Sequence, residues 1–325
     1  MILVMIMLFK TIKNIGGFVQ EYVFMDQQQS DSFMMCLHLH QPIINRKKAM
    51  LLIHGATDCG LVFLSRFYPR FSDYFIIAPD LPGHGLSGGI LFDVNPKDTK
   101  WTLDQCMHRL KTFESVVVVA ESLGSLVWLH YLNTMTPIHR APSLINILLG
   151  CPIYLTTNPL LYLAGIFGSH LPFVNDIRNP LLTHRVGNFC CPYRLQANNL
   201  IKIQMGLGTE TSYFPTLRLL GHIHRYQGYV QQMTVQHRFP CLFLYGSKDS
   251  TVDIPRSLSV IHQQHFPFRM YASGHNLLMS RDPGSIEAVF KDAKMYIQSF
   301  SHTVGLKKNK EPCNQNKTSH KTCPK

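Results

Sequence analysis

A serine at position 122 lies between a strand-like and a helix-like stretch of the chain. Val116 to Ala120 is the most strand-like run in the sequence, and a helical pattern begins directly after Ser122. A sharp strand-to-helix turn here would lift the serine hydroxyl above a sheet and aim the first N–H groups of the helix at the bond under attack. Gly124 suits such a turn, although Ala120 stands where the pattern usually has glycine. The pattern predicts a nucleophilic serine, and a serine that only caps a helix is the alternative.

Two later loops contain groups that could activate this serine. His275 follows the last short apolar run, and Asp249 follows the apolar run before it. A serine hydroxyl needs a base, and a histidine base needs a carboxylate that fixes its tautomer. Loops at one edge of a parallel sheet lie close together, so we expect Ser122, Asp249 and His275 to meet. Asp253 is the alternative acid, but Asp249 is closer to the end of its predicted strand.

The negative charge that develops on an attacked carbonyl needs two backbone N–H donors. The N–H of Leu123 directly follows the predicted nucleophile and is the first candidate. The loop His54-Gly55-Ala56 follows the first core strand, and we predict that Ala56 supplies the second N–H. We expect His54, and His84 in the turn Pro-Gly-His-Gly, to have structural roles.

The spacing of apolar runs predicts the elements that position these residues. After residue 35, short apolar runs alternate with longer mixed segments, as in a parallel sheet with crossover helices. The rhythm stops between about 152 and 238, which predicts a mostly helical cap inserted over the edge of the sheet where such folds bind ligands. The expected strands are 50–53, 74–78, 116–120, 144–149, 241–245 and 268–271, and the expected helices outside the cap are 61–71, 102–113, 123–132 and 285–300.

Five short motifs in this order and rhythm resemble those of the α/β-hydrolase superfamily. They are His54-Gly55, Asp80-x-Pro-Gly-His-Gly-x-Ser87, Ala120-x-Ser-x-Gly124, Gly246-x-x-Asp249 and Gly274-His275. The resemblance extends over about residues 48 to 300. Within the superfamily, the layout is similar to monoacylglycerol lipases, lysophospholipases and serine-aminopeptidase-like hydrolases.

The resemblance implies an α/β fold with a mostly parallel central sheet flanked by helices and a helical cap inserted after the sixth strand. It implies a catalytic triad of Ser122, Asp249 and His275, with an oxyanion hole formed by the N–H groups of Ala56 and Leu123 and with no cofactor. No motif in the cap can be matched, so the resemblance does not extend to the substrate.

The composition favours one globular domain with less regular ends. Of 325 residues, 46% are hydrophobic and only 15% are charged, which excludes a disordered chain. We assign the hydrolase domain to 36–300 and expect a basic, disordered tail over 301–325. The first 35 residues stay unassigned. They begin with an apolar run that is too short to span a bilayer and that suits a strand, a membrane-surface segment or residues upstream of the true start.

Charge and cysteine usage limit the partners and the location. The net charge is +12, but six lysines and one glutamate lie in the last 24 residues, and no nucleic-acid motif is present, so we expect no nucleic acid partner. Nine scattered cysteines without a CxxC pair favour a reducing, cytoplasmic compartment. The pairs His38-x-His40 and His222-x-His224 have no third ligand at a suitable spacing, so we expect no metal.

These features predict a serine hydrolase that cleaves the carboxylic ester of an acyl lipid or another apolar molecule. An amidase or aminopeptidase of the same fold is one alternative, although a site for a free amine would favour acidic residues and the cap has two against seven basic ones. A non-catalytic binding protein of this fold is the other. The basic and apolar cap also suggests peripheral contact with anionic membrane, against the simpler alternative of a solvated basic face.

Overall fold

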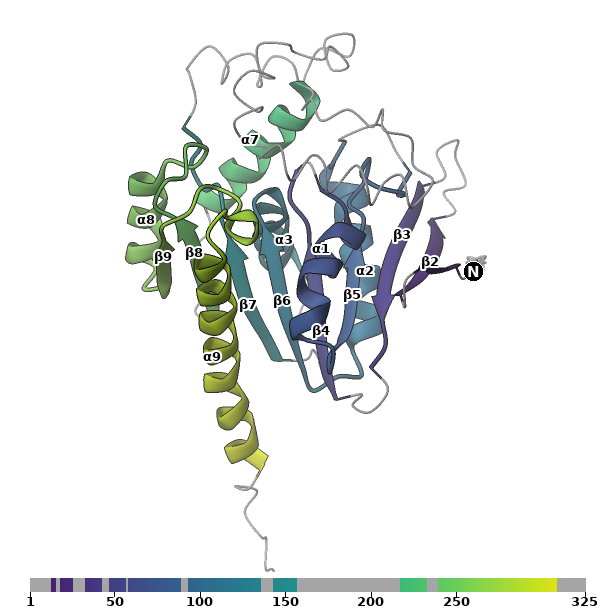
Figure 1. Ribbon diagram of the computed structural model, residues 1–325. Coiled ribbons are helices and arrows are strands. Elements are labelled where there is room, and N and C mark those ends of the chain that lie inside the picture. The colour runs from purple at the N-terminus through teal and green to yellow at the C-terminus, as the bar shows by residue number, and fades with distance from the viewer. Residues whose placement is uncertain are drawn as a thin grey trace, which may run out of the picture.

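A single sheet of nine strands forms the centre of the part of the chain that the structure describes. The structure is a computed structural model, and it describes residues 13–15, 18–25, 33–42, 47–56, 58–88, 93–135, 143–156, 217–232 and 239–308. The strand order is β1-β2-β3-β5-β4-β6-β7-β8-β9 (Figure 1). The strands are β1 (Lys13–Ile15), β2 (Phe18–Met25), β3 (Phe33–His40), β4 (Lys48–Ile53), β5 (Phe75–Pro79), β6 (Ser115–Glu121), β7 (Ser143–Leu149), β8 (Cys241–Gly246) and β9 (Phe268–Tyr271).

Six neighbouring strands of the sheet run parallel: β5, β4, β6, β7, β8 and β9. Strands β1, β2 and β3 extend the sheet with antiparallel pairings at the β5 side. The mostly parallel sheet confirms the fold class expected from the sequence. The edge strands begin earlier than the assigned domain start at residue 36, because β1 and β2 lie in the unassigned segment. They also make β7, the strand before the predicted cap, the seventh in chain order rather than the sixth.

Helices cover both faces of the sheet because alternate residues of each central strand point to opposite sides. Leu51 and Val118 belong to one buried cluster, and Leu52 and Val117 belong to the other. The first cluster is covered by α2 (Pro96–Leu110), α3 (Leu123–Thr134), α7 (Leu217–Gln231) and α8 (Ile254–Gln263), and the second by α1 (Gly60–Phe67) and α9 (Pro283–Lys308) (Figure 1).

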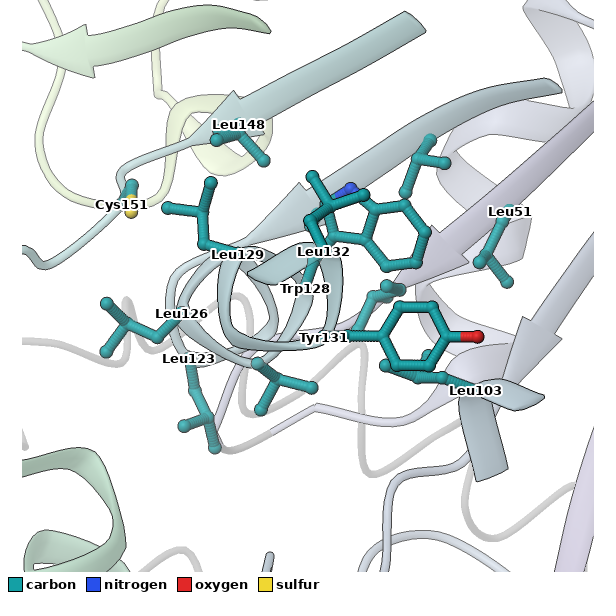
Figure 2. Close-up of a cluster of buried hydrophobic side chains, with 14 of the residues drawn as sticks. Leu51, Leu103, Leu123, Leu126, Trp128, Leu129, Tyr131, Leu132, Leu148 and Cys151 are labelled. Atoms are coloured by element: carbon teal, nitrogen blue, oxygen red, sulfur yellow. The ribbon is translucent and has the colours of Figure 1, made fainter. Parts of the chain in front are cut away.

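Helix α3 is buried on nearly all sides, which fixes the element that begins next to Ser122. Trp128 lies at its centre among aliphatic side chains of the sheet and of α2 (Figure 2). Its indole N–H donates to Asn146 Oδ1 of β7 at 2.7 Å, and Tyr131 donates its hydroxyl to Asp104 at 2.9 Å. The helix is therefore held by packing and by two side-chain hydrogen bonds.

Two of the differences from the predicted elements have local causes. Helix α2 begins at Pro96 rather than at 102, because Asn95 caps it by accepting the N–H of Asp98 at 3.0 Å. The predicted helix 61–71 ends earlier, and the 3-10 turn η1 (Tyr68–Arg70) follows it at Pro69. Helix α8 was not predicted, and α9 continues past the expected end at residue 300.

Part of the predicted cap and tail lies outside the described residues. Helix α7 is the described helix of the predicted insertion, and it packs against α3. Its Tyr226 hydroxyl donates to Val94 O at 3.1 Å, and its Gln227 amide donates to Pro152 O at 2.7 Å. The remaining segments, 157–216 and 233–238 of the insertion and 309–325 of the tail, are outside the described ranges.

Candidate active site

Ser122 lies in a sharp turn between the end of β6 and the start of α3. Its φ of 51° is positive, a conformation that non-glycine residues rarely adopt and that marks a strained backbone. The Ser122 N–H donates to Leu149 O at 2.8 Å, and the Ser125 hydroxyl donates to Ala120 O at 2.8 Å, so hydrogen bonds hold both sides of the turn. A Cβ on Gly124 would lie 2.5 Å from Ile53 O, which explains the glycine.

The structure brings together the three side chains that the sequence singled out. His275 Nε2 lies 2.9 Å from Ser122 Oγ, and His275 Nδ1 lies 2.8 Å from Asp249 Oδ2. The other oxygen of Asp249 accepts the N–H groups of Thr251 at 2.8 Å and Val252 at 3.0 Å. We call this hydrogen-bonded set the Ser122–His275–Asp249 array.

The environment of Asp249 keeps its carboxylate charged. Burial alone would raise the pKa of Asp249, but the hydrogen bond and charge of His275, with the two backbone N–H groups, hold that pKa below its ordinary value. Asp249, and not the alternative acid Asp253, lies on His275 Nδ1. The side chain of Asp253 instead accepts the N–H of Arg256 at 3.2 Å and caps α8.

The loop after β4 lies against the turn at Ser122. A Cβ on Gly55 would lie 3.4 Å from Ser122 Cβ, and Ala56 is the next residue. Gly55 O accepts hydrogen bonds from His54 Nδ1 at 2.8 Å and from Asp58 N–H at 3.2 Å. Since Gly55 O and the N–H of Ala56 belong to one peptide plane, these bonds set the direction of that N–H. Leu123, the other predicted donor, is the first residue of α3.

His54 and His84 support this loop, in agreement with the structural roles expected for them. His54 Nε2 accepts the N–H of Leu81 at 3.0 Å, so its proton must lie on Nδ1, and burial lowers the pKa of His54. His84 Nε2 lies 2.8 Å from Ala56 O, and burial lowers the pKa of His84 to about 4. Both imidazoles are therefore neutral at neutral pH.

Gly150 directly follows β7 and borders the site, although none of the five sequence motifs includes it. It has a φ of 54°, and a Cβ at this position would lie 3.0 Å from His275 O and 3.3 Å from His275 Nδ1. The loops that follow β7 and β9 therefore place Gly150 against His275. A glycine directly after a buried parallel strand was the available signal.

The two histidine pairs considered as metal ligands have protein partners. His38 lies 3.1 Å from Asp80, whose carboxylate also accepts the N–H groups of Gly60 at 2.6 Å and Leu86 at 2.8 Å. Cys36, His38 and Asp80 place three potential ligand atoms within 4.8 Å of one another, but these hydrogen bonds already explain their arrangement as an anchor for the loop after β5.

The second pair lies on α7. His222 lies 2.5 Å from Asp93, and His224 lies 2.9 Å from Gln227.

Among the described residues, no helix is long and apolar enough to cross a membrane. Five of the seven basic residues of the predicted cap, on which the anionic-membrane hypothesis depends, lie outside the described residues: Arg178, Arg185, Arg194, Lys202 and Arg238.

Comparisons with known proteins agree with this architecture. A monoacylglycerol lipase from Paleococcus ferrophilus superposes with a TM-score of 0.60 and 14% identity, over 82% of this chain and 98% of that one. A soluble variant of monoglyceride lipase from Saccharomyces cerevisiae gives 0.59 and 15%, over 86% and 96%. A thermophilic esterase from Thermogutta terrifontis gives 0.56 and 14%, over 85% and 99%.

These identities show the fold and do not extend to the substrate. A search of curated proteins gave no significant match. The sequence model of the alpha/beta hydrolase family matches residues 50–288, which is more than half of the chain and includes Ser122, Asp249 and His275. The chain therefore belongs to the alpha/beta hydrolase family.

Proposed function

We propose that this protein is a serine hydrolase that cleaves carboxylic esters, with an acyl lipid or another apolar ester as its substrate. The observation that supports this most strongly is the continuous pair of hydrogen bonds from Ser122 Oγ through His275 to Asp249, at 2.9 and 2.8 Å. The names of the similar structures, two monoacylglycerol lipases and an esterase, favour an ester as the substrate.

In the proposed reaction, Ser122 Oγ attacks the ester carbonyl while His275 Nε2 accepts its proton. The carbonyl oxygen becomes an oxyanion that the N–H groups of Ala56 and Leu123 stabilise. Collapse of this intermediate breaks the bond to the alcohol, which leaves with the proton from His275. Water then attacks the acyl-enzyme with His275 as the base, and the carboxylic acid and free Ser122 result.

Turnover of p-nitrophenyl esters of graded chain length tests the proposal. We expect the wild-type protein to hydrolyse them and Ser122→Ala to lose at least ~10⁴-fold in turnover with the fold intact. Ser65→Ala is the matched control, because the Ser65 hydroxyl only donates to Val62 O within α1. Substantial turnover by Ser122→Ala would overturn the proposal, and the chain-length profile identifies the preferred acyl group.

A further inference from the structure

Arg66 of α1 connects the two segments that supply the predicted oxyanion donors. Its Nη1 atom lies 2.8 Å from Asp58 Oδ2, in the loop after β4, and 3.6 Å from Glu121 Oε2, at the end of β6. Asp58 lies two residues after Ala56, and Glu121 directly precedes Ser122. One guanidinium group therefore contacts both segments.

The hydrogen bonds of Asp58 carry this contact to the peptide that includes the N–H of Ala56. The Asp58 N–H donates to Gly55 O at 3.2 Å, and Asp58 Oδ1 accepts the N–H of Cys59 at 3.0 Å at the start of α1. A Cβ on Gly55 would lie 3.9 Å from Glu121 Oε2, so the loop lies directly beside the Glu121 side chain. A shift of Asp58 would therefore turn the peptide plane between Gly55 and Ala56.

The guanidinium of Arg66 compensates the charges of two buried carboxylates, those of Asp58 and Glu121. The side chains of Asp58 and Glu121 are 0% and 2% exposed, and that of Arg66 is 12% exposed. Buried carboxylates are stable only when they are paired, and two without a nearby cation repel each other. Loss of Arg66 would weaken the compensation of this repulsion, which acts between the loop after β4 and the end of β6.

We propose that Arg66 is a positioning residue that holds the N–H groups of Ala56 and Leu123 at the spacing an oxyanion requires. The inference rests on the proposed ester hydrolysis and goes beyond it, because Arg66 does not belong to the Ser122–His275–Asp249 array. Its contribution appears in the transition state and not in the binding of substrate, since the ground-state carbonyl depends less on this spacing.

The test compares Arg66→Met with the control Arg70→Met. Arg70 lies four residues further on, where it pairs with the exposed Glu287 and lies over the Phe290 ring at 4.2 Å, away from the loop. For Arg66→Met we expect kcat on a p-nitrophenyl ester to fall about 10- to 100-fold, as for a displaced oxyanion donor, with KM within about threefold of wild type. Affinity for an alkyl boronic acid, which forms a tetrahedral adduct with an active serine, should fall by a similar factor. Arg70→Met should keep all three values.

Amide hydrogen exchange gives a readout that does not require activity. Exchange over residues 54–59 should be faster in Arg66→Met than in wild type or Arg70→Met. If Arg66→Met does not fold, Asp58→Asn replaces it, because the amide retains the shape and weakens the bond to Arg66. For this variant we expect a smaller loss of kcat, again without a change in KM.

The outcomes separate the inference from the proposed function. Folded Arg66→Met with wild-type kcat and unchanged exchange over 54–59 would overturn the role of Arg66 alone, as would a rise in KM with kcat unchanged. In the fallback case, Asp58→Asn with wild-type kcat would do the same. A wild-type protein without turnover or boronic acid binding would overturn the proposed function, and the catalytic part of this inference with it.

Discussion

Asp249→Asn is a nearly isosteric change whose effect follows from the hydrogen bonds around the carboxylate. One oxygen of Asp249 accepts two backbone N–H groups, from Thr251 and Val252, and the other faces His275 Nδ1 at 2.8 Å. An asparagine would place its carbonyl oxygen towards the two N–H donors, so its NH₂ group would face Nδ1. Nδ1 must then accept, the imidazole proton moves to Nε2, and Nε2 can no longer accept the proton of Ser122.

This change of tautomer sets the expected magnitude. We expect turnover to fall about 10⁴-fold, the loss typical of a wrong histidine tautomer, which corresponds to about 5.5 kcal/mol in the activation barrier. Asp253→Asn is the matched control, because Asp253 caps α8 and asparagine caps a helix about as well as aspartate. It should keep turnover within about twofold.

The assay is initial-rate hydrolysis of a p-nitrophenyl ester at pH 7.5, with thermal unfolding of each variant to show that it is folded. Asp249→Asn that retained a tenth or more of wild-type turnover would refute the tautomer argument. A large loss in Asp253→Asn, with a small loss in Asp249→Asn, would move the acid to Asp253.

Three further predictions concern the residues that support the site. Gly150→Ala should destabilise the protein by about 1–2 kcal/mol, measured by urea unfolding, because Gly150 has a positive φ. It should also lower kcat at least tenfold, measured by initial rates, because the new Cβ would displace His275. Trp128→Phe should lower the free energy of unfolding by about 1–3 kcal/mol, because Asn146 Oδ1 loses its buried donor, and an unchanged urea midpoint would contradict this. Burial alone would raise the pKa of Asp80, but its hydrogen bonds and the charge of His38 hold it below the ordinary value. The charged Asp80 carboxylate therefore contributes its full share of folding stability above about pH 3.9, and this share is lost as the pH falls through the folded-state pKa. The melting temperature of wild type should fall more steeply below about pH 4 than that of Asp80→Asn.

The parallel strands and the three members of the array could be predicted from the sequence because their signals are local. Strand β6 contains the continuous apolar run Val116 to Ala120, and β7 is apolar apart from Ser143 and Asn146, as expected for strands that are buried on both faces. Asp249 and His275 follow β8 and β9 by only a few residues, so strand ends in a shared sheet were enough to place them near Ser122.

The features that were missed depend on contacts between distant residues. Strand β2 has the polar residues Gln20 and Glu21 in an otherwise apolar run, and only its antiparallel pairing with β1 and β3 identifies it as part of the sheet. The contacts of Arg66 with Asp58 and Glu121 connect α1, the loop after β4 and the end of β6. No regular spacing of residues in the sequence indicates such a connection. Asp253 stayed an alternative in the sequence because a helix-capping aspartate shortly after a strand cannot be told from a catalytic acid by its spacing alone.

Mass-spectrometric mapping of a fluorophosphonate adduct on the wild-type protein tests the central claim most directly. The probe reacts with an activated serine, so we predict one equivalent of label, located on Ser122, and no label in Ser122→Ala. Prior heat denaturation should abolish the labelling, because activation depends on the folded arrangement of His275 and Asp249. A folded protein that takes no label, or that takes it at another serine, would contradict the assignment of Ser122 as the nucleophile.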